Sequence, residues 1–176
     1  MEGKNEHLFI VKANKNHGFA SFSEARKWAK ENIIGDIQQP IIGVVNISGK
    51  AIEKFLSEKA VDKSTTKDAH LSALKVLPNI IENSLIGEIH YDRDNNPNIR
   101  DIVRLYGYVI IGDDNYRVKT TIKRYNDKNL KSKAYSYEVT KIELLEGFSA
   151  TTHTHSADFV PTSNNSISNR KDTTNF

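Results

Sequence analysis

Residues 99–125, IRDIVRLYGYVIIGDDNYRVKTTIKRY, decide the fold of this chain. Apolar and polar side chains alternate along both halves of the segment, and a period of two is typical of β-strands. The residues from Gly112 to Asn115, between the two halves, are typical of a tight turn. The segment therefore predicts a long antiparallel hairpin.

The alternation also sorts the side chains of the hairpin into two faces. One face is apolar and suits packing against helices. The other face collects Arg104, Tyr106, Arg117 and Lys119. Two more strands are predicted on either side of the hairpin, at residues 85–92 and 134–146. On the second of them Glu138 is assigned to the polar face, and Tyr137 alternates with it.

The first half of the chain predicts mainly helices. A short strand at 7–14 precedes a helix that begins at Ser23, and a second strand at 40–48 precedes a helix capped by Ser48. The segment 70–83 is helical, but Pro78 breaks or kinks it. Because the helices come first and the antiparallel strands come later, the order is typical of an α+β fold. We expect N-terminal helices packed on a C-terminal four-stranded antiparallel meander sheet, in one domain at 1–147 with a polar, disordered tail at 148–176.

Composition excludes several classes of protein. The 176 residues include no cysteine, which excludes a disulfide scaffold, a zinc finger and a thiol nucleophile. No run approaches the roughly 20 apolar residues that a membrane span needs, so a cytoplasmic protein without a membrane partner is the simplest interpretation. The net charge is only +3, but residues 115–133 hold seven Lys or Arg against one Asp. Such a local field attracts phosphate, although a solvated strand surface is the plainer interpretation.

The histidines are the candidates for proton transfer. His90 shares a strand face with Glu88, and His70 opens a predicted helix. Either histidine can serve as a general acid or base, and either can instead be an ordinary polar residue at its place in the fold. His153 and His155 form a pair in the tail, without the further ligands that a metal site needs, so we expect no metal and no cofactor.

Several segments taken together resemble one known family. The resemblance is to the third of the large polyvalent protein-associated domains, which occur in very large proteins of phages and conjugative elements. It covers roughly residues 9–145. The segments that carry it are GFASFSEARKWAKENIIG, VVNISGKAIEKFLSEKAVDKS, HLSALKVLPNIIENS, EIHYD, RLYGYVII, YRVKTTIKRY and YSYEVTKIELL.

The resemblance implies a fold and an activity. Such domains resemble the barnase–EndoU–colicin–RelE nuclease superfamily, which implies a toxin-like hydrolase that cleaves RNA without a metal. Metal-free cleavage needs an acid, a base and cations beside the phosphate. We expect His70, His90 and Glu138 to be catalytic. The residues expected to bind RNA or its phosphate are Lys50, Arg104, Tyr106, Arg117, Lys119 and Tyr137.

Two alternatives remain open at this point. The family often has a histidine where this chain has Val103, and that departure favours a non-catalytic module that binds nucleic acid or protein. A third interpretation is an inhibitor that binds a protein partner through an acidic patch. The geometric question that separates catalysis from binding is whether His70 or His90 lies near the face of Arg117 and Lys119.

Overall fold

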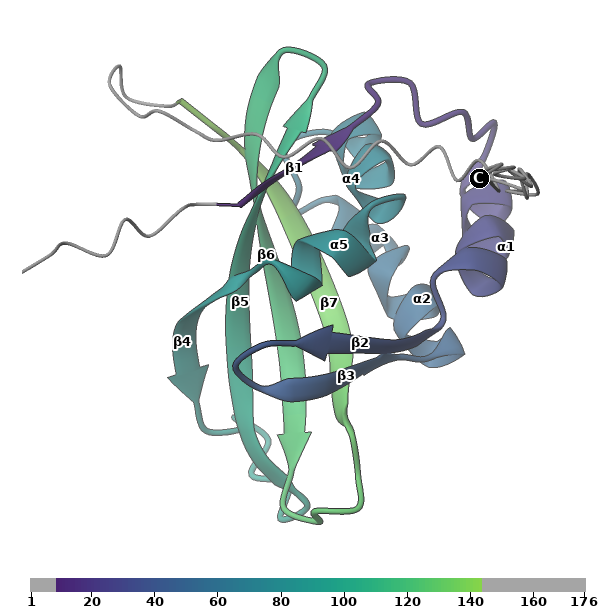
Figure 1. Ribbon diagram of the computed structural model, residues 1–176. Helices are drawn as coiled ribbons and strands as arrows, with labels where there is room; N and C mark the ends of the chain where they lie inside the picture. Colours follow the sequence, from purple (N-terminus) through teal and green to yellow (C-terminus); the bar gives the residue numbers. More distant parts are fainter. Residues whose placement is uncertain (1–8, 144–176) are drawn as a thin grey trace, which may run out of the picture.

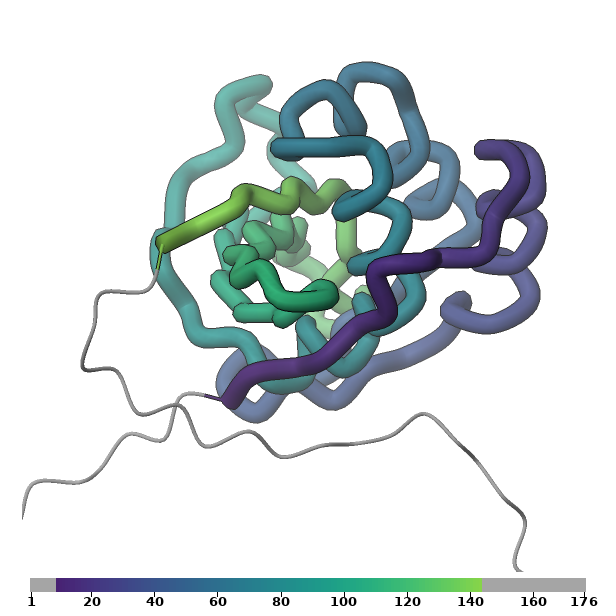
Figure 2. The backbone as a smooth tube through the Cα atoms, turned by 90° about the horizontal axis from the view of Figure 1, so that it is seen from above, coloured from purple at the N-terminus to yellow at the C-terminus, as the bar shows by residue number. Residues whose placement is uncertain are grey.

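The computed structural model describes residues 9–143, which form one curled sheet with helices along one side (Figures 1 and 2). The elements in chain order are β1 (Ile10–Ala13), α1 (Phe22–Asn32), β2 (Gly35–Gln39), β3 (Gly43–Ile47), α2 (Gly49–Phe55), α3 (Glu58–Val61), α4 (Lys67–Leu74), α5 (Leu77–Glu82), β4 (Leu85–His90), β5 (Ile99–Ile111), β6 (Asp114–Tyr125) and β7 (Ser132–Ile142).

The sheet is mixed and has seven strands. Its order is β1-β5-β6-β7-β3-β2, and β4 pairs with β5 beside this path. The pairs β1–β5 and β3–β7 are parallel, whereas the other pairs are antiparallel. The N-terminal half of the chain therefore supplies three strands to the same sheet as the C-terminal hairpin.

The predicted architecture of helices on a four-stranded antiparallel meander is therefore wrong. The α+β prediction separated helices from strands, but β1, β2 and β3 of the first half join the sheet. The sequence of β2, GDIQQ, has no apolar alternation. The segment is nevertheless a strand, because its backbone pairs with β3. Gln39 fixes the turn that follows: its buried side chain donates to Ser84 O at 2.9 Å and accepts from the N–H groups of Ile41 and Ile42. A pattern of apolar residues does not reveal such a strand.

The predicted central hairpin is confirmed. β5 and β6 pair along nearly their whole length and are joined by a two-residue turn in which Gly112 has a φ of +62°. Val103, Leu105 and Val109 of β5 lie in the core, as the alternation predicts. The opposite face of these strands is the outer face of the sheet.

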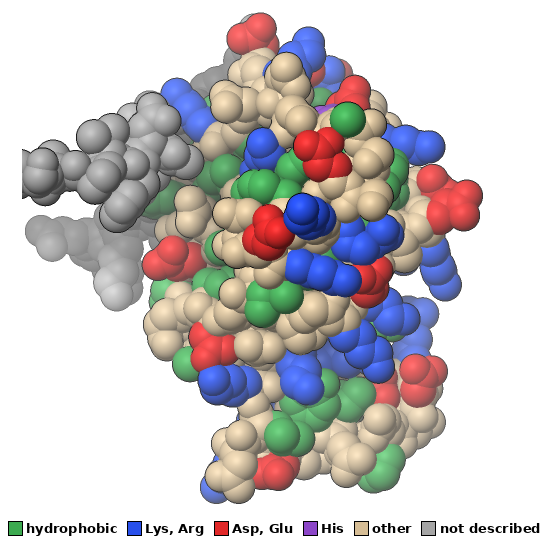
Figure 3. All heavy atoms as spheres, turned by 90° about the vertical axis from the view of Figure 1, so that its right-hand side faces the viewer, with side chains coloured by type: hydrophobic (Ala, Val, Ile, Leu, Met, Phe, Trp, Pro, Cys, Tyr) green, Lys and Arg blue, Asp and Glu red, His purple; other side chains and the backbone are tan. Residues whose placement is uncertain are grey.

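The helix layer matches the prediction in part. Ser48 caps the N-terminus of α2 as expected. The N-cap of α1 is Ser21, two residues before the predicted start at Ser23. The predicted division of this segment into two helices is confirmed, but the break at residues 75–76 precedes Pro78, which lies in the first turn of α5. Lys and Arg side chains gather on the side of the molecule where α1 lies, with Asp and Glu between them (Figure 3).

Within residues 9–143, no helix is long and apolar enough to cross a membrane. The tail predicted at 148–176, with its pair of histidines, lies outside the described residues.

Candidate functional site

Five polar side chains meet on the outer face of the sheet, opposite the helices. Glu88 and His90 come from β4, Arg104 and Tyr106 from β5, and Arg117 from β6. The strand register explains their meeting, because Glu88 lies opposite Arg104. Arg117 lies opposite Tyr108 and therefore diagonal to Tyr106, whose ring its guanidinium reaches. We call these five residues the outer-face cluster.

Hydrogen bonds join the cluster through Glu88. The Tyr106 hydroxyl donates to Glu88 Oε1 at 2.8 Å, and His90 Nε2 lies 2.8 Å from Glu88 Oε2. Arg104 Nε donates to the same imidazole nitrogen at 3.1 Å and lies 3.7 Å from the carboxylate. His90 Nε2 therefore has two competing partners, and the tautomer of the imidazole selects between them. When Nε2 carries the proton, it donates to Glu88. When Nδ1 carries the proton, Nε2 accepts a hydrogen bond from Arg104.

The cluster keeps its carboxylate ionised. The hydrogen bond from Tyr106 holds the pKa of Glu88 below its ordinary value, with help from His90 and Arg104 against a smaller effect of burial. Burial raises the pKa of Tyr106, and the neighbouring carboxylate raises it further. At neutral pH the site thus presents a carboxylate and a neutral phenol beside two guanidinium groups.

A pocket of about 260 Å³ adjoins the cluster. It is lined by Leu85, Ile86 and Gly87 of β4, Tyr106 and Tyr108 of β5, and Arg117 of β6. The Arg117 guanidinium lies 5.0 Å from the centre of the Tyr106 ring, a cation–π arrangement. The ring also lies against Gly87, where an added Cβ would be 2.1 Å from two ring carbons. Gly87 lies at the point where the pairing register of β4 with β5 shifts. A glycine within a strand pattern is a sequence signal for such an irregularity.

Replacing Tyr106 by phenylalanine is expected to raise the pKa of Glu88 toward its ordinary value. The change removes the hydrogen bond that lowers this pKa most, while the ring keeps its place over Gly87. NMR titration of the side-chain carboxyl carbon measures the shift. Tyr108→Phe is the matched control, because Tyr108 lies one pleat away on the same strand face; an equal response in both variants would contradict the role of the Tyr106 hydroxyl.

His70 does not belong to the outer-face cluster, although the sequence pattern suggests a catalytic role. Its side chain is fully buried, with Nε2 2.8 Å from Phe55 O and Nδ1 2.8 Å from Ser64 Oγ. The ring stacks on Tyr137, with 4.1 Å between ring centres. Burial lowers the pKa of His70 to about 4. Its contacts make it a structural residue of the core, without access to a substrate.

The other predicted residues divide between the core and the surface. Tyr137 is fully buried and donates its hydroxyl to His70 O at 2.8 Å, so it offers no face to a nucleobase. Lys119 lies on the outer face opposite Tyr106, and its Nζ is 2.7 Å from Glu138 Oε2. Lys50 is exposed in α2, in the helix layer and not on the sheet.

Glu138 is paired with two cations, Lys119 and Lys63, and these pairs contain neither of the two histidines that were expected to be catalytic with it. Burial works to raise the pKa of Glu138, but the hydrogen bond from Lys119 and the charge of Lys63 outweigh it and leave this pKa lowered. His90 is paired with Glu88 of its own strand, the pair that their shared strand face indicates, whereas Glu138 is paired with Lys119. Val103, where the resemblance led to the expectation of a histidine, is buried on the opposite face from Arg104, so the valine lies outside the cluster.

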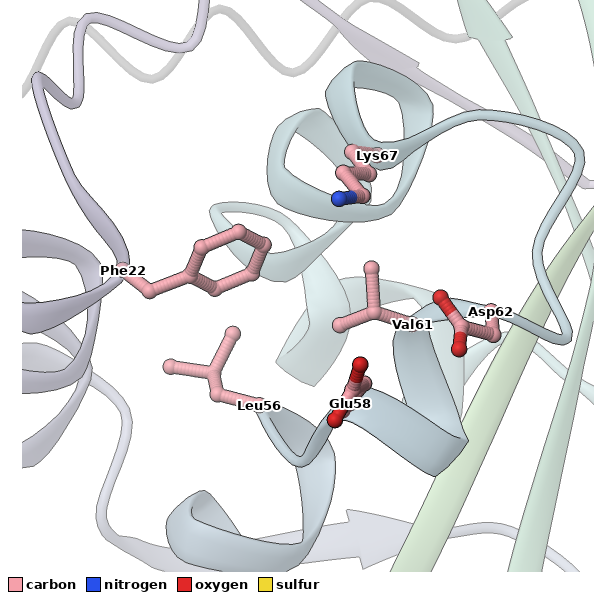
Figure 4. A pocket seen from close by; sticks show the side chains of 6 residues that line it. All are labelled: Phe22, Leu56, Glu58, Val61, Asp62 and Lys67. Carbon is pink, nitrogen blue, oxygen red and sulfur yellow. The ribbon is translucent and has the colours of Figure 1, made fainter.

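A second pocket lies in the helix layer and has a different character (Figure 4). It measures about 260 Å³ and has an apolar floor of Phe22, Leu56 and Val61. The carboxylates of Glu58 and Asp62 line it on one side and Lys67 on another. Two carboxylates repel a phosphate, which makes this pocket a poor nucleic-acid site.

Comparison with known proteins places the chain in a family. The family described as large polyvalent protein-associated domain 3 matches residues 20–135. The chain belongs to this family. The part of the chain that matches large polyvalent protein-associated domain 3 contains the whole outer-face cluster, whereas β1 and most of β7 lie outside the matched residues.

No curated protein and no solved structure matches the chain. Among the described residues, no group of three or more His, Asp or Glu side chains lies close enough to hold a metal ion.

Proposed function

We propose that the outer face of this domain binds RNA and that the outer-face cluster cleaves it without a metal, in a large polyvalent protein of a mobile genetic element. The observation that carries the proposal is the contact of His90 Nε2 with Glu88, beside two arginines on an exposed face. The proposal rests on these side chains. It does not rest on the resemblance to the nuclease superfamily, whose expected sheet differs from the one described above.

The Glu88–His90 pair supplies a base. When Nε2–H donates to Glu88, the imidazole Nδ1 is left as the proton acceptor, and the carboxylate stabilises the imidazolium that forms. Nδ1 takes the proton of an RNA 2′-hydroxyl, whose oxygen attacks the adjacent phosphorus. The bond from phosphorus to the 5′-oxygen breaks, and the leaving oxygen takes a proton from water. The hydroxide that remains takes the proton from the imidazolium, which restores water and the neutral imidazole. The products are a 2′,3′-cyclic phosphate and a 5′-hydroxyl.

The arginines supply positive charge where the reaction needs it. The negative charge on the phosphate oxygens increases in the transition state, and guanidinium groups placed beforehand stabilise it. Arg104 lies next to the imidazole, and Arg117 lies over the ring of Tyr106. The adjoining pocket, lined by Tyr106 and Tyr108, is suited to a nucleobase, because single-stranded RNA is held largely by stacking on aromatic rings.

One observation favours binding without cleavage as the second candidate. Arg104 Nε also donates to His90 Nε2 at 3.1 Å, and this arrangement requires the tautomer that carries its proton on Nδ1. In that tautomer His90 has no free acceptor for a 2′-hydroxyl proton. The cluster then holds phosphate and does no chemistry.

The test is cleavage of total RNA and of a tRNA pool in the presence of EDTA. We expect the wild type to give fragments that end in a 2′,3′-cyclic phosphate. His90→Ala is expected to slow cleavage by about 10²-fold or more, because general base catalysis contributes roughly that factor. Glu88→Gln should lower the rate while leaving the affinity for RNA little changed.

The matched control is His17→Ala. His17 forms a second histidine–carboxylate pair among residues 9–143, with Nε2 3.2 Å from Asp68 Oδ1 of α4 in the helix layer. Cleavage by this variant should equal that of the wild type. A wild type that binds RNA in a salt-sensitive manner but cleaves none would replace this proposal by the binding module.

A further inference from the structure

A basic pocket lies at the opposite edge of the outer face, where β7 meets α2 and α3. It measures about 240 Å³ and is lined by Lys54, Lys59 and Lys63 from the helical side and by Tyr135, Ser136 and Glu138 from β7. We call it the lysine pocket. The sequence pattern gave no role to its three lysines.

A β-bulge turns Tyr135 outward into this pocket. The pairing of β6 with β7 shifts between Thr121, which faces Ser136, and Ile122, which faces Ala134, so Tyr135 is the extra residue. Ala134 and Tyr137 are buried on either side of the bulge, whereas Tyr135 is 37% exposed. A bulge redirects a side chain in this way and is common beside functional sites.

Two lysines flank the exposed ring. Lys123 Nζ lies 4.1 Å and Lys54 Nζ 5.5 Å from the centre of the Tyr135 ring. Among the described residues that line the pocket, Glu138 carries the negative charge, and it is already paired with Lys119 and Lys63. An aromatic ring with cations around it is the arrangement that holds a stacked base and its phosphates.

The lysine pocket is joined to the outer-face cluster by a row of paired residues. Glu88 faces Arg104, Arg104 faces Thr121, and Thr121 faces Ser136. The row crosses four neighbouring strands, a distance of about 14 Å at the usual strand spacing. Lys119 and Lys123 line the same face of β6 along the way. One short single strand is able to reach both sites.

We propose that the lysine pocket is a second nucleotide subsite, which takes a base and phosphate of single-stranded RNA whose scissile bond lies at the outer-face cluster. A base stacks on Tyr135, and the phosphates beside it bind Lys54, Lys59 and Lys63. Stacking of a separate base requires an unpaired strand, so the site selects single-stranded over duplex RNA. This inference rests on the proposed function for its ligand, and it assigns the strandedness of that ligand and the two places on the sheet that it contacts.

The test measures the affinity of the full chain for a fluorescent ten-nucleotide RNA by anisotropy, at 50 mM and 200 mM salt. Tyr135→Ala is expected to weaken binding about tenfold, whereas Tyr135→Phe keeps the ring and stays within about twofold of the wild type. Lys59→Ala should weaken binding and reduce the dependence on salt by about one phosphate contact. Lys67→Ala is the matched control, since that exposed lysine lines the acidic pocket in the helix layer.

The outcomes separate this inference from the cleavage proposal. Weaker binding by Tyr135→Ala in a protein that cleaves nothing supports the subsite and overturns cleavage. Unchanged binding by Tyr135→Ala overturns the subsite, even where the wild type cleaves RNA. A duplex of equal length that binds as tightly as the single strand also overturns it, as does a wild type that binds no RNA.

Discussion

Replacing His70 by alanine is expected to remove about 4 kcal/mol from the free energy of unfolding. The side chain is fully buried between Phe55 and Tyr137, so its removal leaves a cavity in the core. The change also leaves Phe55 O and Ser64 Oγ without the imidazole partners that they have at 2.8 Å. Urea unfolding at pH 7.5, followed by the fluorescence of Trp28, measures the loss.

The same residue makes stability depend on pH. Burial lowers the pKa of His70 to about 4 in the folded state, from an ordinary value near 6.5. Above pH 6.5 the imidazole is neutral in both states and its contribution to stability is fully present. As the pH falls from 6.5 to 4, the unfolded chain takes up a proton that the folded chain refuses, which costs about 3 kcal/mol in total.

The comparison of wild type with His70→Ala isolates this dependence from that of the other groups. The difference between their unfolding free energies should narrow by about 3 kcal/mol between pH 7 and pH 4. His17→Ala serves as the control, because its partly exposed pair with Asp68 contributes at most about 1 kcal/mol. A difference that stays constant over this range would mean that His70 is not held neutral by the fold.

The central hairpin and its polar face could be predicted from sequence, because the alternation of side chains along a strand determines both. Strict alternation fixes which residues share a face, and it placed Arg104, Tyr106 and Arg117 together without knowledge of the rest of the fold. The pair of Glu88 and His90 follows from the same rule within β4. What the alternation does not give is the neighbour of each strand, so it did not reveal the contacts between β4 and β5 that join Arg104 to His90 and Tyr106 to Glu88.

The parts that sequence did not reveal depend on contacts between distant segments. The strand β2 is polar and is held by pairing with β3 and by the side chain of Gln39, neither of which leaves an apolar pattern. The parallel pairs β1–β5 and β3–β7 join segments far apart in the chain. A bulge shifts the phase of β7, so Tyr137 faces the core while Tyr135 faces outward. One extra residue in a strand changes the face of the sheet to which alternation assigns a side chain.

Replacing Gly107 by alanine is expected to cost about 3 kcal/mol of stability, through crowding of a packed interface and disturbance of a buried hydrogen bond. Gly107 lies in the middle of β5 on its buried face, where α5 crosses the sheet. A Cβ there would lie 2.6 Å from Ile80 Cγ2, 2.6 Å from Ser84 Oγ and 3.2 Å from the backbone oxygen of Ile80. The backbone atom belongs to a helix and cannot turn aside as a flexible side chain can.

Movement of α5 would disturb more than the contact itself. Ser84 Oγ donates to Ile80 O at 2.6 Å, and Ser84 O accepts from the buried side chain of Gln39 at 2.9 Å. A shift of α5 away from Gly107 therefore loosens the turn between β2 and β3 as well. Thermal and urea unfolding should both report the loss, and amide exchange should become faster in α5 and β2 before it does in β6.

Gly49→Ala is the matched control for this prediction. An added Cβ at Gly49 meets only Ile34 Cδ1, at an ordinary 3.7 Å, and the residue begins α2, so alanine should leave stability unchanged or raise it by up to about 1 kcal/mol. Equal stability of the Gly107→Ala and Gly49→Ala variants would show that α5 moves away from Gly107 with no loss in the free energy of unfolding. The expected contrast would instead mean that α5 packs too closely on Gly107 for a side chain to fit between the helix and the sheet.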